Sequence, residues 1–283
     1  MIRQDLSDRA SELRDTRTPF VHARVVVAER PTSAKPGDEA IVLGDGRIEG
    51  FVGGECAEAT VVRESLSALG AGQPVVLRIT PTAEPDQEGK LVVHNPCLSG
   101  GTLEIFLEPS LPAPRVQVAG ESPTARALVA LGRPLGYEIL AWSGPVEPDT
   151  AAVVVCSHGR DEERPLMAAL EAGVAYIGLV ASRKRGSAVV SALAAGDDQK
   201  ARIRTPAGLD IGAATAEEVA LSILAEIVQG QPRQARAGHP LVVNVCTAVD
   251  PVCGMSVTVT PDALHVDDVY FCGPGCMKAY QAS

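Results

Sequence analysis

Residues 115–228 alternate between short apolar runs and segments with helical periodicity, and this alternation limits the possible folds more than any other feature of the chain. Arg115 to Ala119 and Ala152 to Cys156 are apolar runs of strand length. Thr215 to Val228 has its apolar residues at the spacing of an amphipathic helix. Repeated strand–helix units place successive strands parallel in one sheet with helices on its faces. We therefore predict a Rossmann-like open parallel sheet in residues 113–230.

The other elements of this region follow the same order. A helix is expected to begin at Ser122-Pro123, because serine is a good N-cap and proline suits the first helical position. Further strands are expected at Tyr137 to Trp142, Ala175 to Val180 and Arg202 to Arg204, and further helices at Glu162 to Ala172 and Arg185 to Ala195.

Residues 1–112 have a different pattern, which predicts an α+β domain. Asp45-Gly46 is a tight-turn dipeptide between Ala40 to Leu43 and Arg47 to Val52, so these two segments are expected to pair as a hairpin. Gly53-Gly54 then opens a helix that runs to about Leu69. Additional strands are expected at Phe20 to Glu29, Pro74 to Ile79, Lys90 to His94 and Thr102 to Leu107.

Charge and hydropathy exclude two classes of function. The net charge is −10, and the longest basic cluster is Arg183-Lys184-Arg185, so the concentrated cationic face that nucleic acid requires is missing. The chain has no run of 18 apolar residues and no signal-peptide pattern near Met1, so we expect a soluble, cytoplasmic protein without a membrane span. Thiols stay reduced in that compartment, and the seven cysteines are therefore expected to be reactive or metal-binding rather than disulfide-bonded.

Two glycine-rich turns that each carry a cysteine are candidates for a binding site in the first region. GFVGGECAE (50–58) runs into a helix, so backbone amides there can hold an anion and the thiol pKa is lowered. NPCLSGG (95–101) is a second such turn. The alternative is a small buried cysteine behind a glycine turn, but two such turns in one region favour a shared site. The residues expected to bind a cofactor there are Gly53, Gly54, Cys56, Glu58, Cys97, Gly100 and Gly101.

The first strand-to-helix turn of the Rossmann-like region is a candidate phosphate site. Gly120 and Ser122 are the residues expected to contact the phosphate, through close backbone approach and a helix N-terminus. Ser122 stands where a second glycine is usual, and the next strand ends at Trp142 without the acidic residue that holds a ribose hydroxyl. A degenerate Rossmann-like scaffold is therefore favoured over a working NAD site.

Two further polar groups in this region allow both a structural and a functional interpretation. Cys156 and His158 follow a buried strand at the edge where parallel sheets gather ligands, although a lone histidine is more often structural. The cluster Arg183-Lys184-Arg185 follows Ser182 at another strand-to-helix turn, where it is either an anion site or a solvated surface cluster.

The last part of the chain, residues 247–283 (the cysteine tail), is expected to bind a soft metal. Cys253, Cys272 and Cys276 lie within 24 residues, the last two with a C-x3-C spacing. The tail is too small to bury a core of its own. The alternative is a hairpin and helix with free thiols that packs on the main body.

These motifs resemble the XdhC/CoxI family over residues 18–229. The resemblance lies in GFVGGECAE (50–58), NPCLSGGTLEIFLEP (95–109), YIGLVASRKR (176–185) and TPAGLDIGAATAEEVALSILAEI (205–227). The cysteine tail, with DPVCGM (250–255) and YFCGPGC (270–276), resembles the YHS domain. The chain is thus expected to consist of an XdhC/CoxI N-terminal domain (1–112), a Rossmann-like XdhC domain (113–230), a linker (231–246) and a YHS domain (247–283).

The family resemblance implies a cofactor chaperone rather than an enzyme. Such proteins bind the molybdenum cofactor (molybdopterin), protect it during sulfuration, and insert it into a molybdenum hydroxylase such as xanthine dehydrogenase or carbon monoxide dehydrogenase. Its expected partners are the large subunit of the apo-hydroxylase and a cysteine desulfurase, and the resemblance is also compatible with a homodimer. In the tail, Cys253, Cys272 and Cys276 match the YHS pattern for zinc or another soft metal, with His265 or Cys246 as fourth ligand. The alternative functions are an NAD(P)-dependent oxidoreductase and a metal sensor or metallochaperone.

Overall fold

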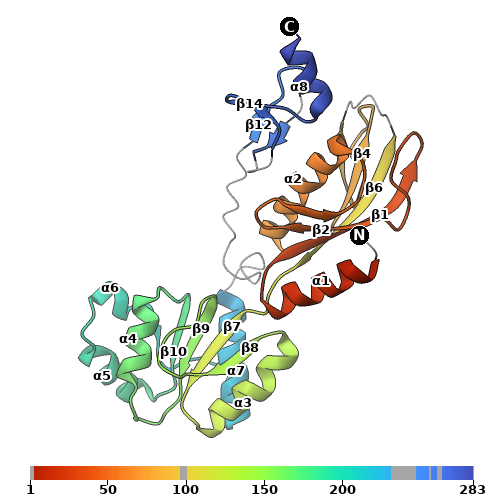
Figure 1. Ribbon diagram of the computed structural model, residues 1–283. Helices are drawn as coiled ribbons and strands as arrows, with labels where there is room; N and C mark the ends of the chain where they lie inside the picture. Colours follow the sequence, from red (N-terminus) through yellow and green to blue (C-terminus); the bar gives the residue numbers. More distant parts are fainter. Residues whose placement is uncertain (1–2, 96–100, 231–246, 255, 260–262, 283) are drawn as a thin grey trace. The chain divides into compact units, whose positions relative to one another are not determined.

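The computed structural model describes residues 3–95, 101–230, 247–254, 256–259 and 263–282 (Figure 1). The chain forms two compact units. The first unit comprises Met1–Pro112 together with Pro240–Ser283, and the second comprises Ala113–His239. The first unit is therefore built from two stretches of sequence that the second unit separates.

Residues 3–110 of the first unit form a mixed sheet with helices on both faces (Figure 1). The elements are α1 (Arg3–Asp15), β1 (Phe20–Glu29), β2 (Glu39–Leu43), β3 (Ile48–Gly50), α2 (Glu55–Ala71), β4 (Val75–Thr80), β5 (Lys90–His94) and β6 (Thr102–Ser110). The strand order is β3-β2-β1-β6-β4-β5, and every pair is antiparallel except β4 with β5. The hairpin predicted around Asp45-Gly46 is the β2–β3 pair.

Alternating side chains of the strands separate two cores. In β1, Val21, Ala23 and Val25 are buried against the face that α2 covers, and the main core of the first unit lies there. Phe20 belongs to the opposite face, where α1 contributes Leu6, Ala10 and Leu13. A shift of one residue in strand register would exchange the two sets of side chains, so the sequence pattern fixes the pairing.

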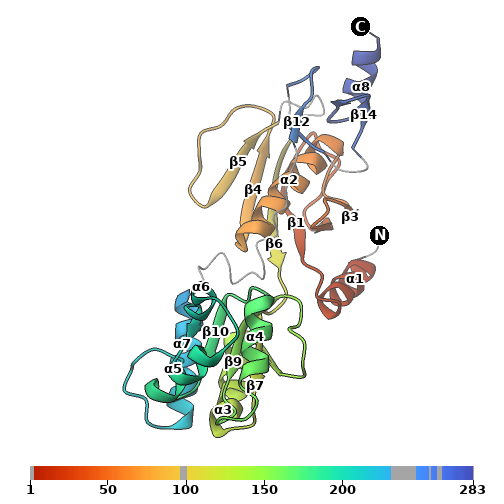
Figure 2. The same ribbon diagram turned by 90° about the vertical axis from the view of Figure 1, so that its left-hand side faces the viewer.

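The second unit is a doubly wound parallel sheet (Figures 1 and 2). Its elements are β7 (Arg115–Ala119), α3 (Pro123–Gly132), the 3-10 helix η1 (Arg133–Leu135), β8 (Glu138–Ala141), β9 (Thr150–Val155), α4 (Glu163–Glu171), β10 (Tyr176–Leu179), α5 (Arg183–Ala192), α6 (Asp197–Lys200), β11 (Ile203–Arg204) and α7 (Ala216–Gly230). The strand order is β11-β10-β9-β7-β8, and all neighbouring pairs are parallel. The core on one face includes α3 and α7, and the core on the other includes α4 and α5. The prediction of an α+β domain followed by a Rossmann-like parallel sheet is confirmed.

The cysteine tail consists of two small strand pairs and a helix. These elements are β12 (Thr247–Val249), β13 (Ser256–Thr258), β14 (His265–Val266), β15 (Val269–Tyr270) and α8 (Pro274–Gln281). β12 pairs with β13 and β14 pairs with β15, both antiparallel. No helix in the described part of the chain is long and apolar enough to cross a membrane.

Candidate functional site

The two glycine turns of the first unit meet at one cavity. The cavity has a volume of about 450 Å³, and its lining includes Gly54 and Cys56 from the first turn and Gly101 from the second. Pro31 and Asn95 line it as well. Three of the residues predicted for a shared site, Gly54, Cys56 and Gly101, thus line one cavity, and their binding of a cofactor stays a prediction.

Glycine is required where the first turn enters α2. Gly53 has φ +152°, and a Cβ atom at this position would lie 3.0 Å from the Cβ of Ala57 and 3.3 Å from Cδ1 of Leu103. Gly54 is the N-cap of α2, and a Cβ atom at this position would have no neighbour within 4 Å. The first turn of α2, with half-buried Cys56, therefore opens onto the cavity.

Gly101 brings the second turn close to the end of β1. A Cβ atom at this position would lie 2.1 Å from the carbonyl oxygen of Pro31 and 2.8 Å from that of Glu29. No side chain fits between these backbone segments, so glycine allows the wall of the cavity to close here.

Asn95, which lines this cavity, also holds a buried acceptor without a partner in the described part of the chain. Its side chain is 5% exposed, and its Nδ2 donates to the carbonyl oxygen of Cys56 (2.9 Å) and to Oγ1 of Thr60 (3.1 Å). The carbonyl oxygen of Cys56 can only accept, which fixes the orientation of the amide. Oδ1 of Asn95 is buried and accepts no hydrogen bond from the described residues. A buried acceptor without a partner is costly.

Of the other residues predicted for this site, Glu58 does not line the 450 Å³ cavity. Glu58 lines a separate cavity of about 550 Å³ together with Glu55. Burial, followed by the charge of Glu55, raises the pKa of Glu58. Cys97 and Gly100 lie outside the described residues.

Gly120 and Ser122 each have a structural role in the turn after β7, and their contact with a phosphate stays a prediction. Gly120 has φ +116°, and a Cβ atom there would lie 2.6 Å from the carbonyl oxygen of Cys156, so glycine allows the turn after β7 to approach β9. Ser122 is the N-cap of α3 and is 6% exposed, and its Oγ accepts a hydrogen bond from the amide of Ala125 (3.2 Å). Cys156 is 2% exposed, and burial raises its pKa to about 11, which suits an inert core thiol.

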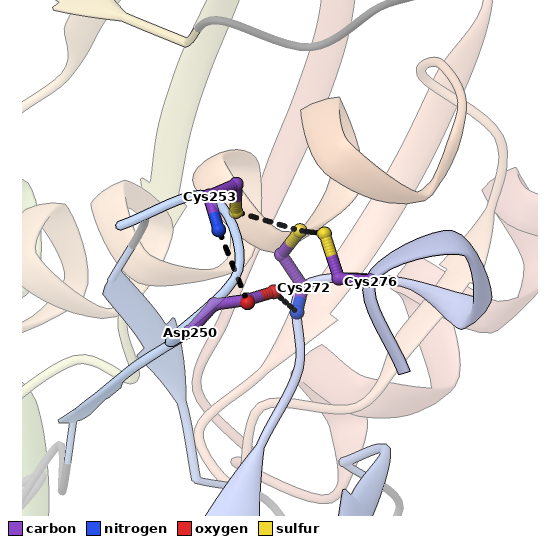
Figure 3. Close-up of side chains that lie close together, drawn as sticks. All are labelled: Asp250, Cys253, Cys272 and Cys276. Atoms are coloured by element: carbon purple, nitrogen blue, oxygen red, sulfur yellow. Dashed lines mark hydrogen bonds between the residues drawn. The ribbon is translucent and has the colours of Figure 1, made fainter. Parts of the chain in front are cut away.

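Three cysteines of the tail gather around one aspartate (Figure 3). The Sγ atom of Cys272 lies 3.5 Å from that of Cys253 and 3.6 Å from that of Cys276. One ligand atom from each of Asp250, Cys253, Cys272 and Cys276 lies within 4.8 Å of the other three. Zinc–sulfur bonds of about 2.3 Å in a tetrahedron space the sulfur atoms about 3.8 Å apart, so the three thiols suit zinc or another soft ion.

Asp250 organises the two turns that carry these cysteines. Its carboxylate is fully buried; Oδ1 accepts from the amides of Val252 (2.8 Å) and Cys253 (3.4 Å), and Oδ2 accepts from the amide of Cys272 (2.8 Å). Burial by itself would raise the pKa of Asp250, but the amides of Cys272 and Val252 outweigh it and lower the pKa to about 2. The carboxylate therefore fixes the thiols in place whether or not it contacts a metal.

His265 is not a member of this group. Its Nδ1 lies 3.0 Å from the carbonyl oxygen of Ala263, and its ring stacks on that of Tyr270 with 5.5 Å between centroids. Cys246, the other residue expected to compete for the fourth position, lies outside the described residues. Asp250 takes the fourth place in the group that the structure brings together.

Sequence reasoning missed Asn95 and Asp250, although each leaves a local signal. Asn95 precedes Pro96 in the second glycine turn, and Asp250 precedes Pro251 three residues before Cys253. An asparagine or aspartate before proline favours a turn in which its side chain forms hydrogen bonds with the nearby backbone. That signal locates a turn, whereas the contact of Asn95 with Cys56 depends on the folding of distant segments.

The chain matches two family models. One is described as the XdhC Rossmann domain and matches residues 116–227. The other is described as the XdhC and CoxI family and matches residues 13–80. The two matches fall on the second unit and on the sheet of the first.

Similar curated proteins cover most of this chain. It is 27% identical over 252 residues to the uncharacterized protein YqeB of Escherichia coli K12, a match that covers 78% of this chain and 45% of YqeB. It is 26% identical over 257 residues to the molybdenum cofactor insertion chaperone PaoD of the same organism, covering 71% of this chain and 80% of PaoD. The chain thus spans less than half the length of YqeB.

A solved structure is also similar. A crystal structure described as a xanthine dehydrogenase from Bacillus halodurans aligns at a TM-score of 0.39 and 17% identity, covering 79% of this chain and 94% of that one.

Proposed function

The chain belongs to the XdhC and CoxI family, and we propose that it is an accessory protein that binds the molybdenum cofactor and assists its insertion into a molybdenum hydroxylase. The similarity to PaoD, a molybdenum cofactor insertion chaperone, supports this proposal. Xanthine dehydrogenase or carbon monoxide dehydrogenase is the proposed client class. A chaperone of this kind acts by holding and releasing a cofactor, so it needs a binding site and no catalytic constellation.

The 450 Å³ cavity of the first unit carries the proposal. Its residues suit the three chemical parts of molybdopterin. The Cys56 thiol suits molybdenum or its sulfur ligand, and the N-terminus of α2 at Gly54 suits the phosphate. The side chain of Asn95, which lines the cavity, suits the pterin ring, because an amide can accept from a pterin N–H group. When bound, the cofactor would supply the molybdenum centre, and these residues would hold and orient it.

Sulfuration of the cofactor and its transfer to the client define the proposed partners. Held in this cavity, the cofactor would receive sulfur from a cysteine desulfurase and then pass to the large subunit of the apo-hydroxylase. We place both events in the cytoplasm.

Cofactor retention provides the direct test. The protein is purified from cells that make molybdopterin, and bound pterin is oxidised to its fluorescent product and measured. Asn95→Leu and Cys56→Ser are each expected to lower the retained pterin by about tenfold or more, since leaving a buried polar group of the ligand without its partner costs about 1–3 kcal/mol. Cys156→Ala is the matched control, because Cys156 is a buried thiol that does not line the cavity.

Activity of a client hydroxylase provides the second measurement. Cells with Cys56→Ser in place of the wild-type chain are expected to accumulate hydroxylase without molybdenum. If no pterin copurifies with the wild-type protein and the client remains fully active in the Cys56→Ser strain, the proposed function is wrong.

We also propose that the cysteine tail binds a soft metal ion through Cys253, Cys272 and Cys276. Their sulfur positions and the buried carboxylate of Asp250 support this assignment. Metal analysis of the purified protein is expected to give one equivalent of zinc or a similar ion, and Cys272→Ser is expected to lose it. The same metal content in both proteins would contradict the assignment.

A further inference from the structure

The second unit contains a cavity that the proposed function does not use. Its volume is about 860 Å³, within the range of about 300–1,000 Å³ that small-molecule sites occupy. It lies at the carboxyl ends of β10 and β11, the edge at which parallel sheets bind ligands. Neither Gly120 nor Ser122 lines it, so it is separate from the turn after β7.

Basic side chains from three segments line this cavity. They are His158 from the loop after β9, Arg183 and Arg185 from the start of α5, and Arg204 from β11. Two acidic residues, Asp210 and Glu226, line it as well. The hydrogen bonds of these residues decide which charges remain available to a ligand.

Arg185 has a structural role. Its Nη1 donates to both carboxylate oxygens of Glu162 (2.8 and 2.6 Å), and its Nη2 donates to the carbonyl oxygen of Val180 (3.0 Å). Glu162 is 7% exposed and also accepts from the amide of Gly159 (2.9 Å). This partly buried ion pair attaches the loop after β9 to the start of α5.

Glu226 is also engaged by the fold. Its Oε2 accepts from the hydroxyl of Tyr176 (2.6 Å) and from the amide of Gly208 (2.8 Å). These bonds hold the segment after β11 against α7 and β10. The Glu226 carboxylate is therefore part of the wall of the cavity and offers little to a ligand.

Arg183 and Arg204, in contrast, form no ion pair with any residue that the structure describes. Close packing brings their segments together, because a Cβ atom at Gly186 would lie 1.9 Å from Oγ1 of Thr205. Thr205 lines the cavity, and its buried Oγ1 has no hydrogen-bond partner among the described residues. Arg183 and Arg204 thus line one cavity without an ion-pair partner among the described residues, beside the end of α5 that Ser182 caps.

We propose that this cavity binds a small molecule that carries a phosphate or diphosphate group, and that Arg183 and Arg204 hold this group. Guanidinium groups bind phosphate oxygens through paired hydrogen bonds, which a single lysine cannot provide. The N-terminal end of α5 adds a favourable dipole and backbone amides at the same place. A nucleotide and free diphosphate both offer phosphate oxygens to the two arginines. Only a nucleotide would also fill the rest of the cavity.

Calorimetric titration of the full-length protein tests the site at 150 mM salt. Inorganic pyrophosphate, ADP and NADH are the three probes. Pyrophosphate or ADP is expected to bind saturably below 1 mM, and Arg183→Gln with Arg204→Gln is expected to weaken binding about tenfold or more. Arg133→Gln is the matched control, since Arg133 is an exposed arginine of the same unit that does not line the cavity. The control is expected to bind within twofold of the wild type.

The probes also separate the two sources of phosphate. Tighter binding of ADP or NADH than of pyrophosphate assigns the site to nucleotides, and equal binding assigns it to the phosphate group alone. Absence of saturable binding for all three probes overturns the proposal. Binding that the double variant and Arg133→Gln weaken equally also overturns it, because the effect would then come from net charge. Pterin retention is measured in parallel, so failure here is distinguishable from failure of the proposed function.

Discussion

A methyl group at residue 101 would lie 2.1 Å from the carbonyl oxygen of Pro31, well inside van der Waals contact. We expect Gly101→Ala to lower the free energy of unfolding by about 1–3 kcal/mol, the usual cost of overpacking. Gly70→Ala is the control, because nothing lies within 4 Å of its Cβ position on α2 and alanine favours a helix by up to about 1 kcal/mol. Urea denaturation measures the free energy of unfolding of both variants. Equal stability of Gly101→Ala and the wild type would contradict the packing described here.

The buried thiol of Cys156 predicts a pH dependence at alkaline pH. Burial raises its pKa to about 11, above the value of about 9 in the unfolded chain. The stability that this difference supplies is complete below pH 9 and is lost as the pH rises towards 11. Between pH 8 and pH 10 the wild type should therefore lose on the order of 1 kcal/mol more than Cys156→Ala. Urea denaturation at the two pH values measures the difference, and equal losses would refute the prediction.

Single residues are also where sequence reasoning was least complete. The glycine–cysteine turns identified Gly54, Cys56 and Gly101, which the cavity brings together. Asn95 was not identified, because its contacts to Cys56 and Thr60 join residues at least 35 positions apart. Local patterns show which residues form a turn, but they do not show which buried polar atom the folded chain leaves without a partner.

At the scale of secondary-structure elements, most strands and long helices follow from hydrophobic periodicity. The helix α1 was not predicted, although Leu6, Ala10 and Leu13 have helical spacing and are buried. Its mean hydropathy is low because polar residues fill the remaining positions, so three apolar residues give a weak local signal. Their burial depends on Phe20 and the outer face of β2, which become neighbours only after folding.

The N-cap of α3 gives a prediction at this scale. Oγ of Ser122 accepts from the amide of Ala125, so Ser122→Ala should lower the free energy of unfolding by about 1 kcal/mol. Ser122→Asp, which retains a capping oxygen, should preserve most of the stability. Pterin retention is expected to remain unchanged in both variants, because Ser122 does not line the 450 Å³ cavity. Loss of pterin in Ser122→Ala would instead support the phosphate contact predicted from the sequence.

At the scale of the whole molecule, the two compact units predict two unfolding transitions. We expect calorimetry to resolve both, since each unit has its own core. Zinc at 100 times its Kd should stabilise the first unit, which contains the cysteine tail, by about 2.7 kcal/mol and should leave the second unit unchanged. Gly101→Ala assigns the transition of the first unit, and Cys272→Ser should abolish the zinc effect. A zinc shift that persists in Cys272→Ser would exclude the proposed ligands.

The grouping of the units is a property that no local pattern contains. The sequence locates the boundary between the two units, because prolines cluster near Pro112 and strand–helix alternation begins after it. That Pro240–Ser283 groups with Met1–Pro112 depends on contacts between opposite ends of the chain. Such contacts arise from complementary surfaces, which neither periodicity nor motif spacing encodes.

The order of these stretches has a consequence for synthesis on the ribosome. The sheet of the first unit emerges first, the second unit follows, and the cysteine tail is translated last. The early stretch already contains every residue described as lining the 450 Å³ cavity, from Arg30 to Leu103. Because domains fold as they emerge, a nascent chain can shape this cavity before its metal-binding thiols exist. Translation thus separates in time the two sites for which we propose molybdenum cofactor and metal binding.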